Sequence, residues 1–168
     1  MCRGLYRRVG YDVGVSKIAG ARRASHDDPR VVLEVSSAIE VLKLVDQVSE
    51  QFAQMAGLDD DAVFSFGIAV REATVNAMKH GNAGDRRKRV HIEFDLRDED
   101  SQPYVHVCVR DQGAGFDPAC LPDPLASENM CVTSGRGIFL MRAFMDDVTV
   151  HRAANGGTEI VMRKAVKP

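Results

Sequence analysis

An acid, an amide and an imidazole stand four residues apart in the stretch REATVNAMKHGN, at Glu72, Asn76 and His80. Residues four apart share one face of a helix, so the spacing predicts that the three side chains line up beside the apolar positions Ala73 and Ala77. One interpretation is a binding or catalytic row, and the other is the ordinary solvated edge of an amphipathic helix. Short motifs often match by chance, so this stretch alone favours the solvated edge.

Two glycine-containing segments further along the chain change that preference. DQGAGFDP places Asp111 at the end of an expected strand, followed by Gly113 and Gly115, which allow a backbone to approach a ligand closely. SGRGIFLM places Gly135 and Gly137 just before an expected helix, whose free N–H groups and dipole suit a phosphate. A third segment, GGT, brings Thr158 onto the expected last strand. Each glycine pair alone could be a turn, but the segments taken together make the solvated edge a less satisfactory interpretation of the first stretch.

Two helices are expected to position the first row. The first follows from the apolar spacing of Ala38, Val41, Leu42, Val45, Val48, Phe52 and Met55. Gly57 ends it. Aspartates at 59 to 61 offer an N-cap for the second. The buried stripe of this second helix is formed by Val63, Phe66, Val70, Ala73 and Ala77.

Alternating apolar and polar residues predict strands on either side of these helices. The expected strands lie at residues 31–35, 90–96 and 105–109, with a final hairpin formed by DDVTVHR and GTEIVMRK, the second of which carries Thr158. Residues 117–134 contain three prolines and no clear period, which predicts a long functional loop before a helix at 137–144. His91 and His106 fall on the polar phase of neighbouring strands, where they could meet. Cross-strand polar contacts explain them better than a metal site does.

The fold class predicted from this pattern is α+β. Strands with one apolar face need a covering layer, so we expect a two-layer α/β sandwich with a mixed, mainly antiparallel sheet of about five strands and three helices on one face. Residues 1–30 show little periodicity, and we expect them to be a flexible N-terminal segment before a single domain at 31–168.

Composition excludes several classes of protein. With 45% hydrophobic residues, the 168-residue chain can build one core. No run reaches the roughly 20 apolar residues of a membrane span, and no signal peptide is evident, so we expect a cytoplasmic protein. A formal charge of −2 does not suggest a nucleic-acid-binding surface. The four cysteines have no C-x-x-C spacing, which argues against a disulfide framework or zinc site.

The segments, taken in order over roughly residues 31–164, resemble the GHKL ATPase superfamily, whose Bergerat fold encloses ATP in a helix-and-sheet sandwich. REATVNAMKHGN corresponds to the N box of that superfamily, DQGAGFDP to its first glycine box and TSGRGIFLMRAFMDDV to its second. Within it the chain is most similar to the small bacterial anti-sigma-factor serine/threonine kinases, above all in GIFLMRAFMDDVTV. The expected cofactors are therefore ATP and Mg²⁺.

The resemblance implies a role for each polar residue. Asn76 would offer its amide oxygen to Mg²⁺, and Glu72 would be the general base that accepts the proton of a serine or threonine hydroxyl, or of water. Asp111 would accept a hydrogen bond from the adenine amino group. Thr158 would be its neighbour, acting through its hydroxyl or a water molecule.

The glycines complete the expected nucleotide site. Gly113, Gly115, Gly135 and Gly137 would shape the backbone around the nucleotide, and residues 117–134 would form a lid over ATP. Arg136 either offsets phosphate charge or is a solvated loop charge, and the sequence leaves both open. His80 is left outside the catalytic set, because a helix-end hydrogen bond explains it as well as support of the Mg²⁺ site does.

The expected partners are a sigma factor and an anti-sigma-factor antagonist protein, which the kinase would phosphorylate. The sequence leaves homodimerisation open. We do not expect a sensor histidine kinase, which would need a preceding dimerisation helix pair, or a gyrase, mismatch-repair or chaperone relative, which would need a long downstream region. The serious alternative is a non-catalytic module of the same fold that binds ATP and holds a partner.

Overall fold

The fold is known from a computed structural model that describes residues 29–115, 133–154 and 156–167. The expected N-terminal segment lies outside these residues except for Pro29 and Arg30, and so does nearly all of the expected loop at 117–134. Arg30 already belongs to the first strand, one residue before the expected start at residue 31, and the domain boundary itself stays a prediction.

Helices α1 and α2 form as the apolar spacing predicts. A short 3₁₀ turn, η1 (Ile39–Val41), leads into α1 (Leu42–Met55), and Gly57 then adopts a φ of 88° that ends the helical run. The side chain of Asp59 caps α2 (Asp60–Asn76), because its Oδ1 accepts a 2.8 Å hydrogen bond from the Ala62 N–H. After Asn76 the helix widens into a π turn, η2 (Ala77–Gly81).

Five strands form one sheet. They are β1 (Arg30–Ser36), β2 (Arg89–Glu99), β3 (Gln102–Arg110), β4 (Asp147–Arg152) and β5 (Thr158–Ala165), in the spatial order β1-β2-β3-β5-β4. Every pairing is antiparallel, whereas the sequence suggested a mixed sheet. The β2–β3 hairpin closes tightly through Asp100 and Ser101, whose φ angles of 54° and 65° match the twist of paired strands.

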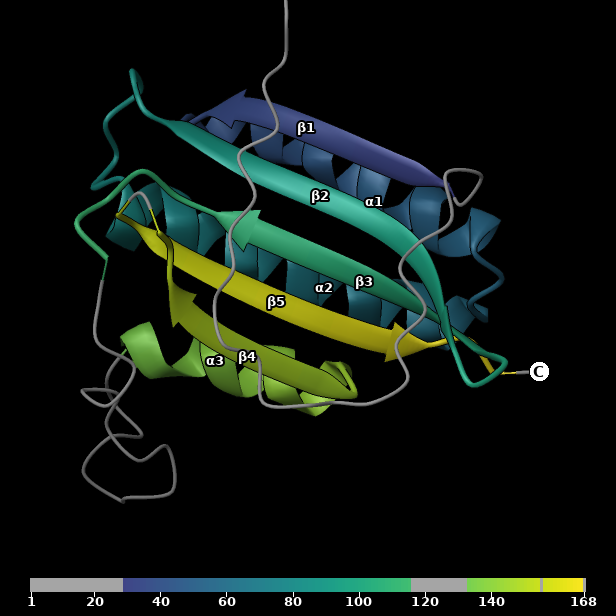
Figure 1. Cartoon of the computed structure of the whole chain (residues 1–168). Coiled ribbons are helices and arrows are strands. Elements are labelled where there is room, and N and C mark those ends of the chain that lie inside the picture. Colours follow the sequence, from purple (N-terminus) through teal and green to yellow (C-terminus); the bar gives the residue numbers. More distant parts are fainter. Residues whose placement is uncertain (1–28, 116–132, 155, 168) are drawn as a thin grey trace, which may run out of the picture.

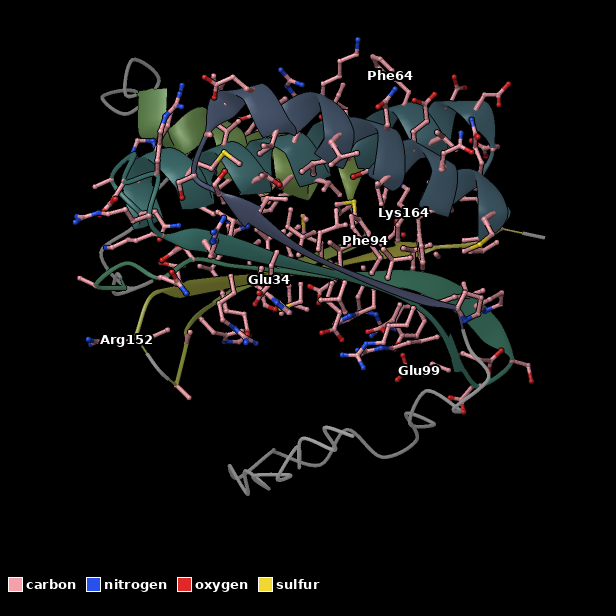
Figure 2. The ribbon with its side chains drawn as sticks, turned by 90° about the horizontal axis from the view of Figure 1, so that it is seen from above. Glu34, Phe64, Phe94, Glu99, Arg152 and Lys164 are labelled. Atoms are coloured by element: carbon pink, nitrogen blue, oxygen red, sulfur yellow. The ribbon has the colours of Figure 1, made fainter. Side chains whose placement is uncertain are left out.

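The helices all cover one face of the sheet, with α3 (Thr133–Phe144) beside α2 (Figure 1). The core lies between the two layers, where Phe94 of β2 meets Phe52 of α1 and Phe66 of α2 at ring-centroid distances of 5.5 and 6.4 Å. Figure 2 shows Phe94 inside the sandwich and Glu34, Glu99 and Arg152 on the opposite, open side of the sheet. The predicted two-layer α+β sandwich is confirmed. None of the helices in the described ranges has the length and apolar character needed to cross a membrane.

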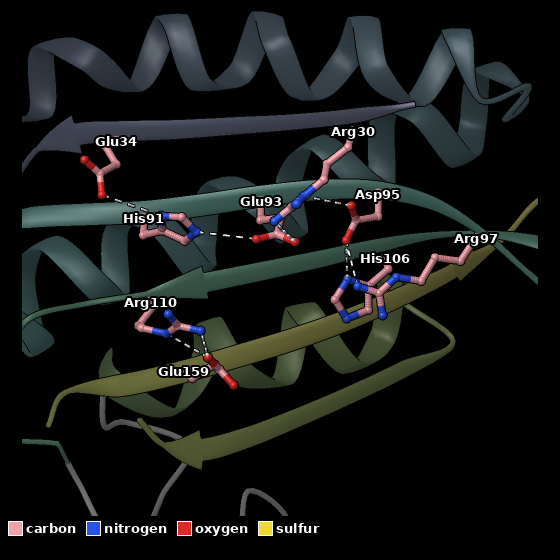
Figure 3. A network of polar contacts seen from close by, with 9 residues as sticks. All are labelled: Arg30, Glu34, His91, Glu93, Asp95, Arg97, His106, Arg110 and Glu159. Atoms are coloured by element: carbon pink, nitrogen blue, oxygen red, sulfur yellow. Dashed lines mark hydrogen bonds and ion pairs between the residues drawn. The ribbon is translucent and has the colours of Figure 1, made fainter. Parts of the chain in front are cut away.

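The open face of the sheet carries a network of charged side chains (Figure 3). Arg30 bridges Glu93 and Asp95 at 2.9 and 3.3 Å, and Arg97 lies 2.7 Å from Asp95. The two Arg30 contacts join β1 to β2 on the side away from the core, while the Arg97 contact lies within β2. The face is therefore polar but largely neutralised by its own ion pairs.

The two histidines on this face do not meet. His106 pairs with Asp95 across the sheet, while His91 lies opposite Arg110 and approaches Glu34 and Glu93 at 3.8 and 3.6 Å. Each histidine thus makes polar contacts, as the sequence predicts, but the strand register keeps them apart. Among the residues that the structure describes, no group of three or more His, Cys, Asp or Glu side chains could hold a metal ion.

We expect His106 to make the fold sensitive to acid. Burial, together with the positive charge of Arg97, lowers the pKa of His106 to about 4, even though the Asp95 carboxylate lies 3.5 Å away. An unfolded chain has a histidine pKa of about 6.5, so below that value it binds more protons than the folded chain. The stability that His106 contributes is therefore present above pH 6.5 and is lost as the pH falls towards 4.

Replacing His106 by glutamine, which does not titrate, should remove up to about 3 kcal/mol of this pH dependence. Urea unfolding of the wild type and of His106→Gln at pH 7 and at pH 4.5 measures how much unfolding free energy each protein loses. The matched control is His151→Gln, which changes an exposed histidine. Equal losses of unfolding free energy in the wild type and His106→Gln would contradict the prediction.

Candidate functional site

The C-terminal half of α2 carries the predicted acid and amide. Glu72 and Asn76 lie one turn apart and are half-buried, and the neighbouring Ala73 and Ala77 are buried in the core. The row was predicted to continue to His80, but η2 interrupts it because a π turn holds more residues than an α turn. His80 is exposed, and the structure gives no reason to add it to the site.

Gly137 brings α3 directly against this row. A Cβ atom added at Gly137 would lie 2.9 Å from Asn76 Nδ2 and 3.1 Å from Glu72 Oε2. A side chain at position 137 would therefore displace the ends of the Glu72 and Asn76 side chains from their present positions. Gly137, which is distant in the sequence, therefore forms one cluster with Glu72 and Asn76.

The start of α3 differs from the prediction. Gly135 and Gly137 were expected just before the helix, but α3 begins at Thr133 and includes both. The predicted helix began at about Gly137, so α3 starts four residues earlier than expected. Glycine is a poor helix former, which makes such a boundary hard to predict. The close packing of Gly137 on α2 explains why the second glycine occurs within a helix. Gly135 and Arg136 lie in the first turn of α3, and phosphate contact by Arg136 stays a prediction.

Asp111 follows β3 and is held by backbone N–H groups. It is only 4% exposed, and its Oδ1 accepts hydrogen bonds from the Gly113 N–H at 2.8 Å and the Thr158 N–H at 3.1 Å. The Asp111 N–H in turn donates to the Thr158 carbonyl at 3.1 Å. Thr158 is thus the predicted neighbour, although the contact uses its backbone; the role expected of its hydroxyl stays a prediction.

Glycines surround Asp111 on several sides. A Cβ atom at Gly113 would overlap the Gly81 carbonyl, and one at Gly81 would overlap the Asp111 carboxylate. Gly115 has a φ of 75°, and a Cβ atom added to it would lie 2.7 Å from the Gly157 carbonyl oxygen. The close approach predicted for Gly113 and Gly115 is therefore an approach to other parts of this chain; their contact with a ligand stays a prediction.

Sequence reasoning missed three residues of this arrangement. Gly81 and Asn82 end the stretch REATVNAMKHGN, and Gly157 belongs to the GGT segment. Gly157 has a φ of 83°, and a Cβ atom there would lie 2.9 Å from Asp111 Oδ1. All three residues belong to motifs that the sequence already indicated as functional, and this was the signal that could have identified them. The sequence does not show that the three come together at Asp111 and its loop.

The structure thus brings the predicted residues into two clusters. Glu72, Asn76 and Gly137 form one, and Asp111 with Gly113, Gly115 and Thr158 forms the other. The π turn η2 connects them, because it starts after Asn76 and ends at Gly81 against the Asp111 carboxylate. At one end, the Glu72 carboxylate and the Asn76 amide suit a cationic or phosphate part of a ligand. At the other end, the Asp111 carboxylate suits a hydrogen-bond donor. The two clusters together therefore suit an elongated ligand that has both parts.

Comparison with known proteins identifies the family of the domain. The family model for the histidine kinase-like ATPase domain matches residues 35–164. An anti-sigma F factor of Clostridium perfringens is 35% identical over 98 residues, which cover 57% of this chain and 67% of that protein. The serine-protein kinase RsbW of Listeria innocua is 26% identical over 147 residues, 84% of this chain and 88% of the relative.

A solved structure shares the fold. The RsbU and RsbW domains of Rv1364c from Mycobacterium tuberculosis superpose with a TM-score of 0.59 at 17% sequence identity. The match covers 83% of this chain and 33% of the longer Mycobacterium chain. At this identity the likeness concerns the fold alone.

Proposed function

Because the chain belongs to the histidine kinase-like ATPase domain family, we propose that it is an ATP-binding anti-sigma regulatory serine/threonine kinase that phosphorylates an anti-sigma-factor antagonist. The observation that carries the proposal is the packing of Gly137 against Glu72 and Asn76. Glu72 and Asn76 lie one turn apart on α2, and their contact with Gly137 lies about one turn from the N-terminus of α3. The free N–H groups and the dipole at that helix end favour phosphate.

Asn76 would hold Mg²⁺ through its amide oxygen, because Mg²⁺ prefers oxygen ligands. When bound, the ion supplies charge neutralisation at the phosphates. Gly135, Arg136 and Gly137 would lie against the phosphates at the start of α3, and residues 117–134 would form the lid. The donor set fits the ion, since an amide oxygen and nearby phosphate oxygens are the ligands that a magnesium–nucleotide complex uses.

Glu72 would act as the general base. In the reaction, the serine or threonine hydroxyl oxygen of the antagonist forms a bond to the γ-phosphorus of ATP, and the bond from that phosphorus to the β–γ bridging oxygen breaks. ADP leaves, and the hydroxyl proton passes to the Glu72 carboxylate. The position of Glu72 one turn before Asn76 supports this role, because the base must face the phosphate that the ion binds.

Asp111 would recognise adenine. Its Oδ1 is occupied by two backbone N–H groups, which leaves Oδ2 as the oxygen to accept a hydrogen bond from the adenine amino group. Burial to 4% exposure strengthens such a bond, since little water competes for it. Thr158 would support the same ring edge through its hydroxyl or a water molecule.

We expect Asp111→Asn to weaken ATP binding by about 1 to 3 kcal/mol, the cost of placing a mismatched polar group in a desolvated site. The amide oxygen can keep the two backbone hydrogen bonds, so its –NH₂ group would face the adenine amino group with a donor in place of an acceptor. Calorimetry on the folded variant measures the effect. An exposed aspartate on α2, changed as Asp61→Asn, is the matched control. Unchanged affinity in Asp111→Asn would remove Asp111 from the adenine role.

The partners we propose are a sigma factor and the antagonist protein, in the cytoplasm. The names of the similar proteins, anti-sigma F factor and serine-protein kinase RsbW, support this class of partner. Purification of the full chain with its endogenous partners, followed by mass spectrometry, tests it. Recovery of a sigma factor together with a small antagonist supports a partner switch, and the mass of the complex reports whether the chain is a homodimer. Recovery of neither partner at native expression would contradict the assignment.

A further inference from the structure

Asn82 is a fully buried amide that joins three separate segments. Its side chain is 0% exposed, and its Nδ2 donates hydrogen bonds to Ser37 Oγ at 2.8 Å and to the Arg89 carbonyl at 2.9 Å. Its Oδ1 accepts a 2.7 Å hydrogen bond from the Gln112 N–H. Both donors of the amide are therefore used, and its oxygen is bound, without any solvent.

The last of these hydrogen bonds reaches the residue that follows Asp111. The Gln112 side chain closes the connection, because its Oε1 accepts a 2.8 Å hydrogen bond from the Arg89 N–H. The backbone on the C-terminal side of Asp111 is thus tied to β2 twice, once through Asn82 and once through Gln112. The part of this network around the Asn82 amide is buried, whereas the Gln112 side chain is exposed. Breaking a hydrogen bond of the buried amide would leave a polar group without a partner, which makes this part stiff.

The π turn delivers Asn82 to this position. The Asn82 N–H donates to the Ala77 carbonyl at 2.8 Å, five residues earlier, which is the π pattern. The same turn places Gly81 so close to Asp111 that a Cβ atom there would overlap the carboxylate. Gly81 therefore limits the Asp111 side chain from one side, while Asn82 fixes the backbone that carries it.

We propose that Asn82 is a positioning residue that sets the orientation of Asp111 and thereby determines the preference for a purine with a 6-amino group. This inference rests on the proposed function, since it assigns Asn82 to the adenine end of the same site. Asn82 itself touches no nucleotide. It acts through the Gln112 N–H and through its neighbour Gly81.

The test compares two nucleotides that differ only in the 6-amino group: ATP and purine riboside triphosphate. Binding of each to the full-length wild type and Asn82→Ala is measured by calorimetry with Mg²⁺, well below the unfolding temperature. We expect Asn82→Ala to bind ATP about 10- to 100-fold more weakly, in line with the loss of a buried hydrogen bond. Binding of purine riboside triphosphate should change less than about threefold, because that nucleotide has no group for Asp111 to bind.

Ser49→Ala is the matched control for general loss of stability. Ser49 is 0% exposed and donates a buried 2.7 Å hydrogen bond to the Val45 carbonyl within α1, so its removal lowers stability without touching the Asp111 loop. Its preference for ATP should equal that of the wild type. If Asn82→Ala does not fold, Ser37→Ala removes one partner of the amide, and a smaller loss of preference for ATP is expected.

The outcomes separate the two hypotheses. A wild type that binds ATP no more tightly than purine riboside triphosphate overturns the adenine role of Asp111 and the inference with it. A wild type that prefers ATP, with the same preference in Asn82→Ala and Ser37→Ala, overturns the role of Asn82 alone. Equal weakening for both nucleotides also overturns it, because that result indicates only a structural role.

Discussion

Glu72→Gln should slow phosphate transfer to the antagonist by roughly 10²- to 10⁴-fold, the usual contribution of a general base. The change keeps the size and hydrogen bonding of the side chain and removes its ability to accept a proton. Because Glu72 is half-buried at the edge of α2 and is not part of the core, the fold should survive. Affinity for ATP and for the partner proteins should therefore stay within about twofold of the wild type.

Radiolabelled phosphate transfer to a co-purified antagonist, measured beside ATP affinity for both forms, checks this prediction. Glu50→Gln, an exposed glutamate on α1, is the matched control and should transfer phosphate at the wild-type rate. If Glu72→Gln transfers phosphate as fast as the wild type, Glu72 is not the base. A wild type that binds ATP and the antagonist but never labels a serine or threonine would support the alternative, a module that binds ATP and holds a partner without catalysis.

The sequence was most informative where one interaction dominates the local structure. The apolar stripe of α2 and the period of two in β2 and β3 predicted these elements, because burial of one face is the main force that forms them. The Asp59 cap and the turn at Gly57 depend only on neighbouring residues and could be predicted for the same reason. The shared face of Glu72 and Asn76 could be predicted because their spacing is a property of a single helix.

The features that the sequence could not show depend on contacts between distant segments. Gly137 lies within a helix because α2 passes directly beside it, and that neighbour is more than 60 residues away in the sequence. The hydrogen bond from the Gln112 N–H to Asn82 Oδ1 spans 30 residues. To infer it, one would need to know both how β2 and β3 are paired and where η2 ends relative to them. The register of β2 and β3 likewise separates His91 from His106. Both lie on the polar face of the sheet, but His91 pairs with Arg110 and His106 pairs with Asp95.

The same reasoning explains why the end of α2 is central to the site. A regular α-helix through residue 81 would continue the row of Glu72 and Asn76 to His80 on the same face. The π turn ends that row after Asn76 and directs Gly81 and Asn82 toward Asp111. One continuous stretch of sequence thus supports both clusters, and a change in its first half should affect phosphate transfer more than adenine recognition.

Asn76→Ala should remove the Mg²⁺ dependence of ATP binding and lower turnover by roughly 10²- to 10³-fold, the range for loss of one preorganised electrostatic contact. Asn76 would be the ligand that α2 offers to the ion, and alanine has no oxygen to replace it. Its half-buried position at the edge of the helix, above the small Ala73 and Ala77, indicates that the fold tolerates the change. Adenine recognition should be kept, because Asp111 is held by its own backbone partners.

A titration of ATP affinity against Mg²⁺ concentration separates this prediction from a general loss of binding. The wild type should bind ATP more tightly as Mg²⁺ rises, whereas Asn76→Ala should bind with one affinity throughout. Gln54→Ala removes an exposed amide from α1 and should titrate as the wild type does. Asn76→Ala with a wild-type Mg²⁺ titration would show that Asn76 does not bind the ion. The magnesium site would then have to be sought elsewhere, although the adenine end of the site would be unaffected, since its residues hold one another in place without Asn76.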